Sequence, residues 1–65
     1  MTPSAAILAS LETVAHETTV MLSALDDLPA TSDRREAKRR VYEIRARAHE
    51  LFEWLAEVRL EEPRN

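Results

Sequence analysis

The chain has 65 residues, which suffices for one small domain predicted to span residues 1–65. It contains no cysteine, so neither a disulfide nor a thiolate metal site can hold the fold together. It also contains no glycine, which excludes glycine-rich phosphate loops and the dinucleotide-binding fingerprint. The net charge of −3 is too small to require a nucleic-acid or membrane partner. We therefore expect a small protein without a cofactor.

The N-terminal segment lacks targeting features. The first basic residue is Arg34, so the start of the chain has no charged region typical of a signal or transit peptide. The longest apolar run near the start, residues 5–9, is far shorter than the roughly 20 residues of a membrane helix. We expect a cytoplasmic protein that does not associate with a membrane.

The first predicted helix covers about residues 3–28. Pro3 suits the first turn because proline has no N–H group to leave unpaired, and Thr2 or Ser4 can cap the helix. Nothing interrupts the pattern until Leu28, which precedes a proline and is therefore pushed away from helical geometry. The first helix is expected to end there.

A turn is predicted at residues 29–32, and a second helix at about residues 33–62. Asp33 followed by Glu36 resembles the start of a capping box, with Thr31 and Ser32 as competing caps, and Pro63 ends this helix. The turn is short, so the two helices are expected to fold back as an antiparallel hairpin in an all-α fold.

Apolar residues recur in both helices at alternating steps of four and three. The mean step of 3.5 residues is typical of a left-handed coiled seam, whereas strands would show a period of two. Thr18 is the polar member of this row; its hydroxyl either bonds back to a carbonyl of its own helix or fixes the register. The predicted oligomer core consists of Ile7, Leu11, Val14, Thr18, Met21, Leu25, Val41, Ile44, Ala48, Leu51, Leu55 and Val58.

A single hairpin covers only one side of each apolar stripe. Because the chain is small and has neither a disulfide nor a metal site, self-association is the expected way to bury the remainder. We predict a homodimer that forms an antiparallel four-helix bundle. The alternative is a hairpin that completes its core on a different protein.

Charge is distributed unevenly along the chain. Residues 1–33 contain no Lys or Arg, residues 34–47 contain seven against two Glu, and residues 48–62 contain five Glu against one Arg. The basic and acidic halves of the second helix could pair between antiparallel copies, or the basic half could bind nucleic acid or an acidic protein. The candidate patch consists of Arg34, Arg35, Lys38, Arg39, Arg40, Arg45 and Arg47.

The two histidines are the best candidates for metal ligands. Glu12 precedes His16 by four residues, and Glu53 follows His49 by four. Di-iron bundles use Glu-x-x-His spacing on inward faces, which this chain does not reproduce, so we expect surface pairs and no metal site. No serine, histidine and acid combination suggests catalysis, and we do not expect an enzyme.

The stretch Ala48-His49-Glu50-Leu51-Phe52 is similar to the Ala-x-Glu-Leu-aromatic segment in the second helix of the plasmid repressor-of-primer (Rop) family. Length and the heptad-patterned hairpin also resemble that family. The resemblance implies an antiparallel homodimeric bundle that binds paired RNA loops. Two functions are therefore considered: a non-enzymatic, self-associating protein that binds or regulates a partner protein, and Rop-like RNA binding through the basic start of the second helix.

Overall fold

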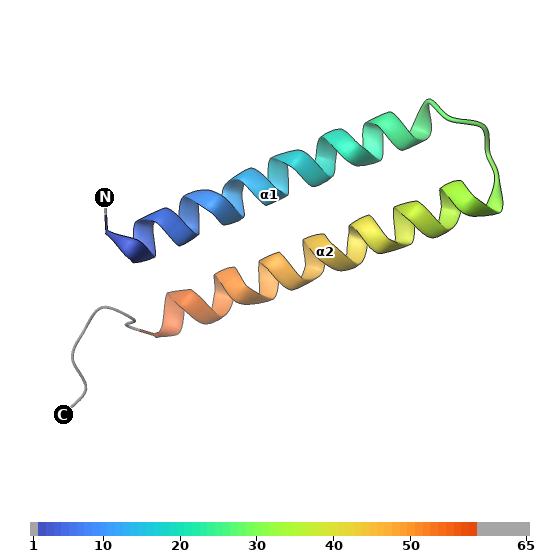
Figure 1. The fold of residues 1–65 in the computed structure, drawn as a ribbon. Coiled ribbons are helices and arrows are strands. Elements are labelled where there is room, and N and C mark those ends of the chain that lie inside the picture. Colours follow the sequence, from blue (N-terminus) through green and yellow to red (C-terminus); the bar gives the residue numbers. More distant parts are fainter. Residues whose placement is uncertain (1, 59–65) are drawn as a thin grey trace.

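The computed structural model describes residues 2–58. It contains two helices, α1 at Pro3–Asp26 and α2 at Ser32–Glu57, which pack side by side in opposite directions (Figure 1). The predicted all-α hairpin is confirmed.

Local hydrogen bonds set the ends of α1. Thr2 is the N-cap, and its Oγ1 accepts a hydrogen bond from the N–H of Ala5 at 3.2 Å, as expected of a threonine before a proline at the first position. The helix ends at Asp26, two residues before the predicted end. There the N–H of Leu28 donates to the carbonyl of Leu25, only three residues back, so the last turn tightens before the proline.

The N-cap of α2 is Thr31, one of the three predicted candidates, and its Oγ1 accepts from the N–H of Arg34 at 3.1 Å. Asp33, the predicted capping-box residue, lies in the first turn of the helix instead. The helix ends at Glu57, and Val58 is extended, with φ −107° and ψ 163°. The predicted continuation at residues 59–62 lies outside the described residues.

The two helices meet along a seam with a seven-residue repeat. Within residues 2–58 only two residues are buried, Thr18 at 0% exposure and Val41 at 8%. The other seam residues are half-buried. The seam consists of Leu11, Thr18 and Leu25 on α1, and Val41, Ala48 and Leu55 on α2.

The predicted oligomer core divides into two groups in the single chain. The seam residues belong to it and are covered, as are the half-buried Val14 and Val58. The other four are exposed: Ile7, Met21, Ile44 and Leu51. The stripe is wider than the contact between α1 and α2, so their place in an oligomer core stays a prediction.

The Thr18 hydroxyl bonds to its own helix. Its Oγ1 donates to the carbonyl oxygens of Val14, at 2.9 Å, and Ala15, at 3.0 Å. These carbonyls belong to α1, so the hydroxyl makes no bond to α2. We expect Thr18→Val to change the free energy of unfolding by less than about 1 kcal/mol, measured by urea denaturation. A loss well above that value would show that the hydroxyl fixes the register instead.

Candidate functional site

The hairpin measures 20 × 12 Å across its long axis, which corresponds to two helices side by side and one helix in depth. Each helix therefore covers its neighbour on one side only. Two broad faces, one on each side of the seam, are left open, and they differ in their chemistry.

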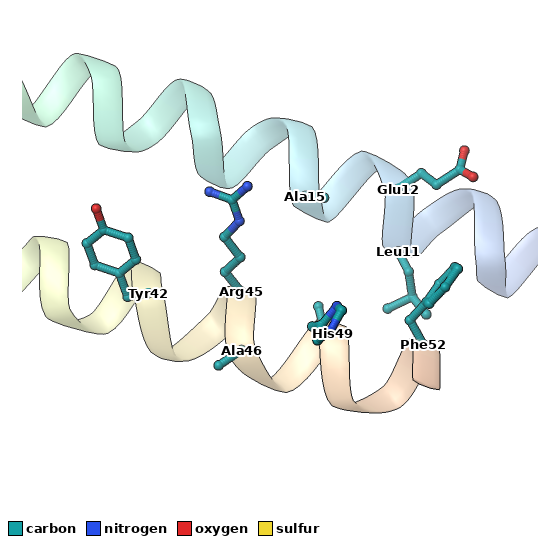
Figure 2. Close-up of a pocket in the computed structure, with 9 residues that line it drawn as sticks. Leu11, Glu12, Ala15, Tyr42, Arg45, Ala46, His49 and Phe52 are labelled. Carbon is teal, nitrogen blue, oxygen red and sulfur yellow. The ribbon is translucent and has the colours of Figure 1, made fainter. Parts of the chain in front are cut away.

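One face is hollowed into a groove of about 550 Å³, lined by Leu11, Glu12, Ala15, Tyr42, Arg45, Ala46, Ala48, His49 and Phe52. Figure 2 shows Arg45 extending from α2 toward α1, between Tyr42 and His49. Ala15 lies on the α1 side and Ala48 belongs to the seam, and neither side chain is large enough to fill the space. The groove is thus apolar at its base, with polar groups and aromatic rings at its edges.

The position of the groove identifies the residues of the other face. Ala15, Arg45 and Phe52 line the groove, and each follows a seam residue by four positions. Residues four positions before the seam residues lie on the opposite edge of each helix, because one turn takes 3.6 residues. They form the apolar face: Ile7, Val14, Met21, Ala37, Ile44 and Leu51.

The apolar face has apolar side chains at all six positions, and its larger side chains are open to water. Around Ile44 it borders the charged side chains of Arg40 and Arg47. Ile7, Met21, Ile44 and Leu51 are all exposed in the single chain. Large contiguous apolar patches are uncommon on monomeric proteins and typically mark an association surface. This face is the strongest candidate for such a surface in the described part of the chain.

Two cations of the predicted patch stabilise the turn. Arg34 Nη1 donates to the carbonyl oxygen of Leu28 at 2.8 Å, and to that of Asp26 at 3.4 Å, at the C-terminal end of α1. Lys38 Nζ lies 2.6 Å from Asp26 Oδ1 and joins the two helices. Cations at a helix C-terminus complement its dipole. The hydrogen bond from Lys38 lowers the pKa of Asp26 below its ordinary value.

Three further cations are paired along α2. The Glu36 carboxylate accepts hydrogen bonds from the guanidinium of Arg39 at 2.6 and 2.9 Å and from that of Arg40 at 3.0 Å. Arg39 also contacts Glu43. Hydrogen bonds from Arg39, and then from Arg40, lower the pKa of Glu36 to about 2, and Glu36 in turn raises the pKa of Arg39. The third is Arg47, whose Nη1 lies 3.4 Å from Glu50 Oε2. Together with the two cations at the turn, five of the seven patch cations have partners in the chain.

Arg35 and Arg45 differ from the other patch cations. No hydrogen bond or ion pair joins either guanidinium to another of residues 2–58. Both are exposed, and Arg45 lines the groove. A ligand can reach these two guanidinium groups without displacing a partner within residues 2–58.

The Glu36 pairs predict a pH dependence. A carboxylate whose pKa is lowered by folding contributes stability above its ordinary pKa, and this contribution is lost as the pH falls through the folded value. We therefore expect the melting temperature to fall between pH 4.5 and about pH 2, with Asp26 contributing in the same direction. Thermal melts across this range should show a flatter profile for Glu36→Gln. An unchanged profile in that variant would contradict the assignment.

The histidine prediction is confirmed for one of the two residues. His49 Nε2 lies 2.9 Å from Glu53 Oε1, and both side chains are exposed, so they form a surface pair one turn apart. Among residues 2–58, no three histidine or carboxylate side chains gather closely enough to hold a metal ion.

The sequence pattern identified the apolar stripe but not the groove. Tyr42 lies off the main stripe, and the alanines at 15 and 48 carry no signal of their own. A row of basic and aromatic residues at helical spacing could have revealed it. Its members follow one another at steps of three and four: Tyr42, Arg45, His49 and Phe52.

Comparison of the chain with protein-family models, curated proteins and solved structures gives no match. The resemblance to Rop therefore extends to the two-helix antiparallel architecture. Within the described residues, neither helix is both long and apolar enough to cross a membrane.

Proposed function

We propose that this chain is a small non-enzymatic interaction protein, in which two copies join through their apolar faces into an antiparallel four-helix bundle that binds or regulates a partner protein. The observation that carries the proposal is the apolar face: six helical positions with apolar side chains, four of them open to water. Small domains bury such faces by packing two layers of secondary structure against each other, and a single hairpin is only one layer.

The dimensions of the face suit a second copy. Its 24-residue helix is about 36 Å long, so with a width of 20 Å the face covers about 700 Å². A standard interface buries about 800 Å² on each partner. The chain exposes 5429 Å², whereas about 4,200 Å² is typical of a folded monomer of 7.4 kDa. The seven-residue repeat runs along both helices, which supports regular side-chain packing between two copies related by a two-fold axis.

Trp54 provides the test, because it is the sole tryptophan and lies one turn after Leu51, at the edge of the apolar face. We expect its emission to move to shorter wavelength with increasing protein concentration, and the melting temperature to rise in parallel, as mass action requires of a dimer. Emission and melting temperature that are both independent of concentration would contradict self-association.

RNA binding is the second candidate function. It is favoured by Arg35 and Arg45, which have no partner in the described chain and are close in sequence to Tyr42. Aromatic rings between cations can stack on bases while the cations contact phosphates. RNA binding would weaken steeply with salt. A flat salt response, or no change in RNA mobility at low salt, would exclude this candidate.

A further inference from the structure

A second hollow, of about 490 Å³, continues the groove toward the turn. It is lined by Ala30, Thr31, Arg34, Arg35, Lys38, Arg39 and Tyr42, so Tyr42 borders both hollows. From Arg35 to Phe52 the combined surface follows about 26 Å of α2. This length matches a helix of about 17 residues rather than a compact small molecule.

The surface changes in character along its length. Near the turn it is basic, and between Tyr42 and Phe52 it is apolar, with Leu11, Ala15 and Ala48 at its base. Apolar bases with aromatic edges accept the side chains that an amphipathic helix projects at every third or fourth position. The groove is therefore complementary to a helix with one apolar stripe.

Charge complementarity specifies the edge of that partner. Arg35 and Arg45 have no partner within residues 2–58 and lie ten residues apart, about 15 Å along α2. A helix with carboxylates separated by three turns presents them at this spacing. Two carboxylates on one edge would then pair with both guanidinium groups.

The α1 side of the groove favours a helix over a nucleic acid. This side carries Glu12, and Asp26 lies farther along the same helix, while residues 1–33 contain no Lys or Arg. A phosphate backbone would place negative charge against these carboxylates, whereas an amphipathic helix can be acidic along one edge only.

We propose that the groove binds an amphipathic helix of a partner protein that carries carboxylates along the edge facing α2. This inference rests on the proposed dimer, because covering the apolar face with a second copy leaves the groove as the free face. The proposed function leaves the partner unspecified, and the groove indicates which side chains that partner carries.

The test uses a labelled synthetic helix of about 17 residues with a leucine stripe and glutamates along one edge. Its companions are the same peptide with lysines in place of the glutamates, and a single-stranded RNA of equal length. Fluorescence anisotropy should show the glutamate peptide binding at least about tenfold more tightly than the lysine peptide. Equal binding of the two peptides, no binding of either, or preferential RNA binding would overturn the proposal.

Two variants locate the binding site. Arg45→Gln should weaken binding of the glutamate peptide about fivefold, whereas the matched Arg47→Gln, outside both hollows and paired with Glu50, should have little effect. Ala15→Glu, which fills the groove and offers Arg45 an internal partner, should abolish binding. Equal effects of the two arginine variants would contradict the assignment.

Sedimentation of each variant separates this proposal from the proposed dimer. A dimer that fails to bind the glutamate peptide would overturn the groove assignment alone. A monomeric wild-type chain would overturn the dimer, whatever the peptide does.

Discussion

Ile44→Asp is expected to dissociate the dimer and unfold the chain. In the single chain Ile44 is 51% exposed, so a carboxylate there would meet water at little cost. In the bundle it lies within the apolar face, where an unpaired charge costs about 3–5 kcal/mol in each chain. Circular dichroism and sedimentation of the variant, at concentrations where the wild type is folded, measure the effect.

Val20→Asp is the matched control. Val20 is 48% exposed and lies two residues after Thr18, on the side of α1 away from α2 and outside both faces. Its replacement should change the free energy of unfolding by less than about 1 kcal/mol. Similar behaviour of the two aspartate variants would mean that the apolar face is not covered in solution.

Leu51→Ala has the second largest expected effect. If a second copy packs on the apolar face, this truncation leaves a cavity and lowers the free energy of unfolding by about 2–5 kcal/mol per chain. Denaturant unfolding, followed by circular dichroism at fixed protein concentration, gives the value.

Phe52→Ala provides a stringent comparison for Leu51→Ala. The neighbouring residues are almost equally exposed in the single chain, at 44% and 42%, but Phe52 lies on the groove face. Phenylalanine loses more apolar surface on truncation, so the single-chain structure alone predicts the larger cost for Phe52. The bundle predicts the opposite order, and a larger loss for Phe52→Ala would count against it.

The ends of the helices could be predicted closely because their chemistry is local. A threonine before Pro3 and a threonine after the turn both act as caps through side-chain bonds to an N–H three residues ahead. α1 ends slightly before its predicted boundary, because the tightening of its last turn depends on hydrogen bonds that the proline rule does not describe.

The division of the apolar stripe could not be predicted in the same way. A 3.5-residue pattern marks a stripe wider than one helix contact, and only the hairpin packing decides that Val41 is covered while Ile44 is open. The partners of the cations in the basic segment could not be predicted either. Arg34 and Lys38 bind groups at the end of α1, which the turn brings close although they are distant in sequence.

Charge pairing within α2 changes how the basic segment is interpreted. Sequence alone left two roles open, pairing between copies and binding of an anionic partner. In the structure, Arg39 and Arg40 already share Glu36 within the helix. Exposed pairs of this kind contribute little to stability and can exchange partners, so both roles stay predictions for these residues.

Sedimentation equilibrium over a range of protein concentrations shows whether the hairpin forms the proposed dimer. A bundle of two hairpins has twice the 7.4 kDa mass of the chain, and it should dissociate on dilution together with loss of helical structure. A compact chain that sediments with the single-chain mass and melts cooperatively at micromolar concentration would contradict the proposed dimer.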